Sequence, residues 1–142
     1  MVTGRLLDED RDIRAVLEQT RTIAVVGLSP KPERDSYRVA RYLMEQGYKI
    51  IPVRPARKEI LGERVYASLD QVNGSIDIVD VFRSPAQVLE HAHAALQLRY
   101  PPRAFWMQLN IENREAADLL MAAGIDVVMN RCIKMDHVRL LG

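Results

Sequence analysis

Short apolar runs alternate with longer amphipathic stretches along most of the chain. Runs such as TIAVVGL and KIIPV are typical of strands that are buried on both faces of a parallel sheet. Pro52 lies inside the second run and indicates that this strand ends close to it. The pattern predicts five strands, at residues 22–28, 49–53, 76–82, 104–107 and 125–129.

The stretches between these runs have the spacing of helices with one buried face. In the first of them, Ile13, Val16 and Leu17 are spaced to share a face. Residues 84–87, Ser-Pro-Ala-Gln, read as a capping box with proline at the first helical position. Gly47 follows the second helix, where a helix end favours a residue with positive φ. The pattern predicts four helices, at residues 8–20, 36–46, 84–98 and 112–123.

The remaining segments are a long connection and the two ends of the chain. Residues 54–75 contain turn signals such as Gly62, and we predict one helical turn near Leu69. We predict that the helix within residues 1–21 packs on the domain and that residues 130–142 form a C-terminal tail. Strands that alternate with helices predict one α/β domain with a doubly wound, Rossmann-type parallel sheet of about five strands and helices on both faces.

Composition excludes several classes of protein. The chain has 142 residues, enough for one domain, and its 48% hydrophobic and 27% charged residues exclude wholesale disorder. No apolar run approaches the roughly 18 residues of a membrane span, and the acidic N-terminal stretch indicates no signal peptide. A net charge of +1 predicts no binding to nucleic acid or an anionic membrane. A single cysteine excludes an intrachain disulfide and a multi-cysteine zinc site, and favours the cytoplasm; we predict no metal site.

The candidate binding residues follow the predicted strands, because doubly wound sheets bind ligands at the carboxyl ends of their strands. They are Gly27, Leu28, Ser29 and Lys31, with Ser36 at the next helix; Val53, Arg54 and Pro55; Phe82, Arg83 and Ser84; Trp106, Met107 and Gln108; and Asn130, Arg131 and Cys132. Lys31, Arg54, Arg83 and Arg131 place a cation after four of the five strands. Cations at one edge of a nearly neutral chain predict an anionic ligand. The alternative is that arginine is simply common in this chain.

The first of these segments favours a phosphate group. A strand, Gly27 and then a helix that starts near Ser36 predict a phosphate seat, because the helix start offers free N–H groups and glycine permits close approach. The loop matches neither G-x-G-x-x-G nor the P-loop motif. Arg54 directly follows the second strand, at a place where an NAD-type site has an acid. A cation there fits a phosphate on the ribose, as in NADP or coenzyme A (CoA).

Six stretches in this order resemble the small stand-alone CoA-binding proteins, which are relatives of the N-terminal CoA-binding domain of the succinyl-CoA synthetase alpha subunit. The stretches are VVGLSPKPERDSYRVARYL, GYKIIPVRP, EILGERVYASL, DIVDVFR, AFWMQLNI and VVMNRCIKMDH. They cover nearly all of residues 22–137. The resemblance implies a Rossmann-type fold that binds CoA, without a well-established reaction. Arg54 stands where the family more often has asparagine, and Asn130 where it often has aspartate.

With CoA as the ligand, each segment has an expected role. Backbone groups of residues 27–29 would face the diphosphate or ribose, and Lys31 would pair with a phosphate. Residues 53–55 would border the adenine and ribose. Residues 82–84 would border the middle of the ligand, and residues 106–108 the pantetheine arm. For Ser36 the alternative is a plain helix cap. For Phe82 and Trp106 the alternative is packing in the core.

No catalytic residue is predicted. The resemblance implies that catalysis in the synthetase needs a phosphorylated histidine from a second domain, for which this chain has no counterpart. His91 and His93 are two apart on a helix, so they do not share a face, and we predict that both are surface residues. His137 is expected to be structural or solvated. Asp80 is expected to pair with a neighbouring arginine.

The sequence leaves Cys132 and the function with alternatives. Cys132 is either a small buried hydrophobe or a reactive thiol that forms a mixed disulfide with CoA. The favoured function is a non-catalytic module that binds CoA or an acyl-CoA, as a carrier, a sensor or the partner of an acyl-CoA enzyme. The alternatives are a small NADP-binding or CoA-dependent enzyme and a nucleotide-sensing regulator. The protein partner stays open.

Overall fold

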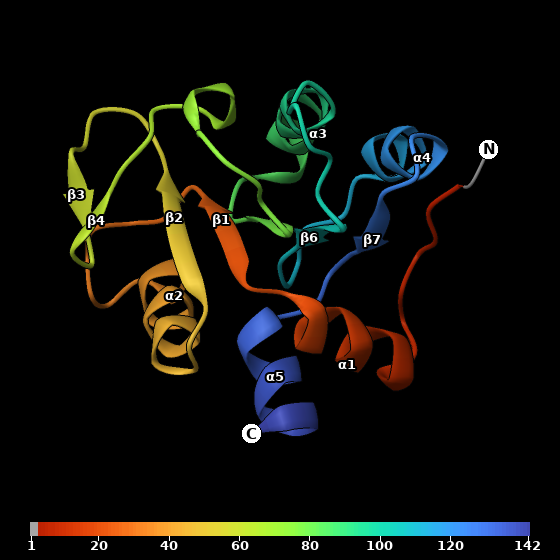
Figure 1. Ribbon diagram of the computed structural model, residues 1–142, viewed down its shortest axis with the longest axis horizontal. Helices are drawn as coiled ribbons and strands as arrows, with labels where there is room; N and C mark the ends of the chain where they lie inside the picture. Colours follow the sequence, from red (N-terminus) through yellow and green to blue (C-terminus); the bar gives the residue numbers. More distant parts are fainter. Residues whose placement is uncertain (1–2) are drawn as a thin grey trace.

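The computed structural model describes residues 3–142 and contains a five-stranded parallel sheet flanked by helices (Figure 1). The strands of the sheet are β1 (Thr22–Val26), β2 (Lys49–Val53), β5 (Ile78–Val81), β6 (Ala104–Met107) and β7 (Asp126–Val128). Their order is β2-β1-β5-β6-β7. Almost every residue of these strands is buried, as the continuous apolar runs predict. The predicted fold class is confirmed: this is a single compact Rossmann-like α/β domain.

Helices cover both faces of the sheet and enclose two hydrophobic cores. The helices are α1 (Asp10–Gln19), α2 (Asp35–Glu45), α3 (Val88–Leu96), α4 (Arg114–Ala122) and α5 (Ile133–Leu141). In Figure 1, α3 and α4 lie on one side of the sheet and α1, α2 and α5 lie on the other. Val88 and Leu120 belong to the first core, whereas Leu17, Leu43 and Ile133 belong to the second. Each amphipathic helix therefore buries its apolar face against the sheet.

The strand order reverses at β1. The chain passes from β1 to β2 on one side and returns to β5 on the other. In doubly wound sheets this switch point opens a crevice at the carboxyl ends of the strands. The crevice lies next to Gly27 and Phe82, which follow β1 and β5.

Two elements were not predicted. Residues 130–142, for which we expected only a tail, contain α5. The connection over residues 54–75 contains the predicted turn at Leu69–Gln71, labelled η1, and also an antiparallel hairpin of β3 (Glu59–Ile60) and β4 (Glu63–Arg64). Leu61 and Gly62 join its strands with φ angles of 55° and 76°, as a type I′ turn requires. Leucine is unusual at such a position, and the sequence therefore carried no clear hairpin signal.

The helix at residues 84–98 begins as predicted but with a tighter first turn. Pro85–Gln87 form a short 3₁₀ helix, η2, that leads into α3. The Gln87 side chain accepts a hydrogen bond from the Ser84 N–H at 3.3 Å, as the capping box predicts. Within residues 3–142, none of the helices is long and apolar enough to cross a membrane.

Candidate functional site

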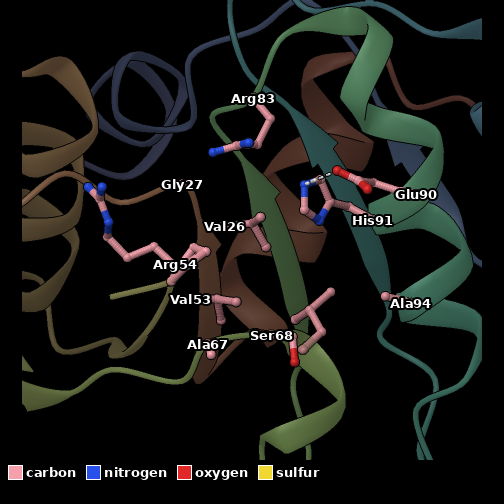
Figure 2. Close-up of a pocket in the computed structure, with 12 residues that line it drawn as sticks. Val26, Gly27, Val53, Arg54, Ala67, Ser68, Arg83, Glu90, His91 and Ala94 are labelled. Atoms are coloured by element: carbon pink, nitrogen blue, oxygen red, sulfur yellow. Dashed lines mark ion pairs between the residues drawn. The ribbon is translucent and has the colours of Figure 1, made fainter. Parts of the chain in front are cut away.

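Two hollows meet at the carboxyl edge of the sheet, and both are lined by Gly27 and Arg54. The first, which we call the α3 cavity, has a volume of about 270 Å³ (Figure 2). Its lining residues are Val26, Gly27, Val53, Arg54, Pro55, Ala67, Ser68, Leu69, Arg83, Glu90, His91 and Ala94. The second, the loop groove, has a volume of about 500 Å³. Its lining residues are Gly27, Ser29, Pro30, Lys31, Arg34, Asp35, Ser36, Arg54, Arg57 and Phe82.

Gly27 forms the ridge between the two hollows. Its φ is +84°, and its N–H donates to the carbonyl oxygen of Val53 at 2.9 Å. A Cβ at this position would lie 2.5 Å from the carbonyl oxygen of Phe82 and 2.9 Å from Cδ of Arg83. The backbone can therefore pass this closely between the ends of β2 and β5 only as glycine.

The loop between β1 and α2 is tied down by serine hydroxyls. Ser36 is buried, and its Oγ accepts a hydrogen bond from the Ser29 N–H at 2.9 Å. The Ser29 Oγ accepts in turn from the Lys31 N–H at 3.1 Å. Ser36 does not cap its own helix, since α2 begins at Asp35 and its N-cap residue is Arg34. The alternative of a plain cap is therefore wrong, and Ser36 instead fixes the loop.

The backbone donors differ from the expected arrangement. The N–H groups of Gly27 and Ser29 are bonded within the protein, and Leu28 is fully buried. Asp35 and Ser36 line the loop groove, so the N-terminus of α2 opens onto it. The first N–H groups of a helix have no acceptor inside the helix. The groove therefore takes its free backbone donors from α2 rather than from residues 27–29.

Replacement of Ser36 by alanine should loosen this loop. The Ser29 N–H would lose its acceptor, which costs about 1 kcal/mol for a part-buried amide. We expect a lower urea midpoint of unfolding and faster hydrogen exchange at the Ser29 amide. Ser75→Ala, at an exposed position, is the matched control. Unchanged exchange at Ser29 in Ser36→Ala would show that the hydroxyl does not hold the loop.

Four cationic side chains line the loop groove: Lys31, Arg34, Arg54 and Arg57. Arg54 is half-buried, and its guanidinium donates to the carbonyl oxygen of Leu28 at 3.3 Å. Its Nε is buried without a hydrogen-bond partner among residues 3–142. Asp35 is the one acid in the lining, and it pairs with Arg38. The groove is therefore a cationic surface with unused donors, which suits a phosphate group.

The α3 cavity combines apolar walls with three polar groups that lack partners. Arg83 Nε and His91 Nε2, like Arg54 Nε, are buried without a hydrogen bond in the described part of the chain. The prediction that His91 is a surface residue is wrong, because it is half-buried and lines the cavity, whereas His93 is exposed. Burial lowers the pKa of His91; Glu90 raises this pKa and Arg83 lowers it by smaller amounts. The lowered pKa of His91 favours the uncharged imidazole.

The residues at the carboxyl end of β6, Trp106 to Gln108, support the fold and line neither hollow. Trp106 and Met107 are fully buried, and Gln108 is buried at 4% exposure, so these residues have no surface for a pantetheine arm. Trp106 Nε1 donates to the carbonyl oxygen of Arg131 at 2.8 Å. Gln108 Oε1 accepts from the N–H of Ile133, at the start of α5, at 3.1 Å. The alternative reading of Trp106, as a core residue, is the one the structure supports.

The residues after β7 are also engaged elsewhere. Asn130 Oδ1 accepts from the Asn110 N–H at 2.6 Å, which joins two loops. Arg131 makes a two-pronged ion pair with Asp136 at 2.8 and 2.9 Å, so its charge is already matched. Cys132 is half-buried in a separate hollow that also contains Leu109 and Met135. None of the three lines the α3 cavity or the loop groove.

The three residues that follow β5 lie in three different places. Phe82 is half-buried and lines the loop groove, Arg83 lines the α3 cavity, and Ser84 is exposed and caps η2. Residues 53–55 lie where they were expected, on the wall of the α3 cavity. The structure therefore gathers the candidates from β1, β2 and β5 around the switch point.

Two further titratable residues are buried away from these hollows. His137 is 5% exposed, and its Nδ1 lies 2.7 Å from the Tyr42 hydroxyl. Asp80 is fully buried, and neither carboxylate oxygen has a hydrogen-bond partner within residues 3–142. The expected ion pair between Asp80 and an arginine is therefore wrong. Within the same residues, no group of three or more histidine, cysteine or acidic side chains could hold a metal ion.

Comparison with known proteins agrees with this geometry. The sequence pattern of a family described as "CoA binding domain" matches residues 21–138, which include both hollows and the whole sheet. The chain belongs to this family. A protein of Bacillus subtilis, uncharacterized protein YneT, is 40% identical over 126 residues, which are 89% of this chain and 92% of that protein.

Two further similar proteins come from Pyrococcus species. A solved structure titled "hypothetical protein from Pyrococcus horikoshii OT3" has a TM-score of 0.91 and 40% identity, with all of both chains covered. The alpha subunit of an ADP-forming acetate–CoA ligase (form II) of Pyrococcus furiosus is 37% identical over 59 residues, which are 41% of this chain but only 13% of that subunit. The chain therefore resembles one part of a larger ligase subunit.

Proposed function

We propose that this protein binds coenzyme A or an acyl-CoA at the carboxyl edge of its sheet, as a binding module without a reaction of its own. The observation that carries the proposal is the pair of hollows that share Gly27 and Arg54. One hollow has cationic walls and the other has mainly apolar walls. A ligand that joins phosphates to a base through a ribose matches this pairing.

The ligand is placed by matching its chemistry to the walls. The phosphates lie in the loop groove, near Lys31, Arg34 and Arg57 and the N-terminus of α2. The adenine and ribose lie in the α3 cavity, against Val53 and Leu69. Arg54 stands between the two and is within reach of a phosphate on the ribose. We place the pantetheine arm outside both hollows, along the edge of the sheet.

The family supports CoA as the ligand more than a dinucleotide. The loop after β1 lacks the later glycines of the dinucleotide motif. The proposal includes no catalytic residue. A cytoplasmic setting stays part of this proposal, in keeping with the single cysteine.

Calorimetric titration of the purified protein with CoA, acetyl-CoA, NADP and NAD tests the proposal. We expect CoA and acetyl-CoA to bind with similar affinity, because the acyl group lies outside both hollows. NADP and NAD are expected to bind more weakly. A preference for NADP over CoA would overturn the proposal and favour an NADP-dependent enzyme.

Arg54→Ala and Lys31→Ala should each weaken CoA binding. A charge-assisted hydrogen bond contributes about 1.5–3 kcal/mol, and we expect roughly a tenfold loss or more for half-buried Arg54. Exposed Lys31 should lose less, about twofold to fivefold, since solvent screens its charge. Lys49→Ala is the control, because this exposed lysine starts β2 at the opposite edge of the sheet. Equal losses for Lys49→Ala and Arg54→Ala would indicate only a general charge effect.

Dephospho-CoA, which lacks the phosphate on the ribose, locates the contact of Arg54. It should bind the parent protein more weakly than CoA does. In Arg54→Ala the two ligands should bind with nearly equal affinity, because the missing phosphate and the missing guanidinium are partners. If Arg54→Ala weakened both ligands by the same factor, Arg54 would have another role.

A further inference from the structure

His91 brings an imidazole to the α3 cavity without a hydrogen bond that satisfies it. Its side chain is 21% exposed, and its Nε2 is covered. The Glu90 carboxylate oxygen lies 3.6 Å from Nε2, which is beyond hydrogen-bond distance. A buried polar atom without a partner is unfavourable, and folded proteins retain few of them. A ligand in the cavity is a natural source of the missing partner.

The surroundings of His91 indicate which chemical group this is. Val53, Leu69 and Ala94 give the cavity apolar walls. In Figure 2 the imidazole of His91 lies beside Glu90, and Ala94 lies further along the same helix. A purine base has two apolar faces and a polar edge. Its faces can pack against the apolar walls while its edge hydrogen bonds to the imidazole. A phosphate matches this place less well than it matches the loop groove, where four cations are gathered.

We propose that His91 is a specificity-determining residue, whose neutral imidazole hydrogen bonds to the edge of a purine base in the α3 cavity. The inference rests on the proposed function, in which the base is the adenine of CoA. A neutral imidazole has one donor and one acceptor nitrogen, and adenine presents both kinds of group along its edge. In this pairing the unpartnered Nε2 accepts from the exocyclic amino group of adenine, so the ring must be uncharged, because an imidazolium has no acceptor nitrogen.

This requirement makes base recognition dependent on pH. Three charged groups line the cavity with His91: Glu90 from α3, Arg83 from the segment after β5, and Arg54 from the end of β2. The segment around η1 contributes Ser68 and Leu69, which carry no charge. Burial is the largest effect that opposes an imidazolium; the charge of Arg83 adds to it, and the charge of Glu90 partly offsets it. The neutral ring is thus maintained above the lowered pKa of His91, and the contact is lost as the pH falls through that pKa.

Three variants separate this role from a structural one. His91→Leu keeps the bulk of the side chain and removes its polar atoms, so CoA affinity should fall by roughly 3- to 10-fold at about pH 7.5. His91→Gln keeps a neutral polar group, so it should restore most of the affinity and should weaken less than the parent between about pH 7.5 and about pH 5.5. His93→Gln, at the exposed histidine of the same helix, should keep both the affinity and the pH dependence of the parent. Thermal unfolding of each variant confirms that it folds.

Base selectivity is the second readout. The parent should prefer adenosine 3′,5′-bisphosphate to inosine 3′,5′-bisphosphate, since the two differ at the edge of the base. The preference should disappear in His91→Leu. A preference that persists unchanged in folded His91→Leu would overturn the inference, as would CoA binding that strengthens on acidification through His91, which would place an anionic group there.

The failure of this inference is distinct from the failure of the proposed function. A parent protein that binds CoA while His91→Leu binds it equally well retains the proposed function and overturns the role of His91. A parent that binds neither CoA nor adenosine 3′,5′-bisphosphate at any pH overturns both.

Discussion

Gly27→Ala should abolish CoA binding and markedly destabilise the fold. The residue has a φ of +84°, a region that costs an L-residue about 1–2 kcal/mol. The new Cβ would also lie 2.5 Å from the carbonyl oxygen of Phe82, a backbone atom that cannot swing aside. Relief requires that the ends of β1 and β5 move apart. We expect a loss of about 3–5 kcal/mol in the free energy of unfolding.

Gly62→Ala is the matched control for this variant. Gly62 has a similar φ of +76°, but a Cβ there would meet nothing within 4 Å. Gly62→Ala should therefore lower the free energy of unfolding only by the backbone strain. CoA affinity should stay unchanged, because Gly62 lies in the β3–β4 hairpin. Urea unfolding and calorimetry measure the two effects. Equal losses of stability in the two variants would show that the contact with Phe82 is unimportant.

The sheet could be predicted from sequence because each of its strands is buried on both faces. Such strands read as short apolar runs, with no ambiguity about which face is polar. The α5 helix could not be predicted in this way, because its buried residues are Ile133, Asp136 and His137. Two polar residues on the buried face hide the helical period. Asp136 is satisfied by Arg131, and His137 by Tyr42, which are partners that only the tertiary structure reveals.

The sequence analysis placed candidate residues after all five strands, and the structure brings those after three of the strands to the two hollows. The sequence shows where each strand ends, and all five ends do lie at one edge. The order of the strands decides which ends border the switch point, and local sequence does not encode that order. The segments after β6 and β7 lie away from β1, where Gln108 and Trp106 anchor the chain that enters α5.

His91 was missed for a related reason. Alanine occurs on both buried and exposed helix faces. The alanines around His91 therefore do not show which face of the helix the histidine lies on. In the structure Ala92 and Ala95 are buried against the sheet, and this rotation turns His91 toward the cavity and leaves His93 in solvent. The signal available in the sequence was the position of His91 after the cap at Ser84, which places it close to the carboxyl edge.

Asp80 is an acid without a partner in the middle of the sheet. It lies between Val25 on β1 and Trp106 on β6, and both of its oxygens are buried without hydrogen bonds in the part of the chain that the structure describes. Burial raises the pKa of Asp80 well above its usual value. The native state therefore holds a proton that the unfolded state releases above about pH 4. Because the native state binds more protons, stability falls as the pH rises from there toward the raised pKa, by about 1.4 kcal/mol for each pH unit.

Asp80→Asn should therefore stabilise the protein at neutral pH. Asparagine has nearly the same shape as aspartate and does not ionise. The loss of stability that the parent shows above about pH 4, where Asp80 ionises in the unfolded state, therefore disappears. We expect urea unfolding to show a gain in stability at about pH 7 that shrinks as the pH falls below the raised pKa of Asp80 toward about pH 4. Asp77→Asn is the contrasting control, because the Asp77 carboxylate accepts from the N–H groups of Arg21 and Thr22 at 2.8 and 3.1 Å. It should lose about 1 kcal/mol at neutral pH. If Asp80→Asn instead kept the pH dependence of the parent, Asp80 would be ionised in the native state and its charge would be satisfied by the protein.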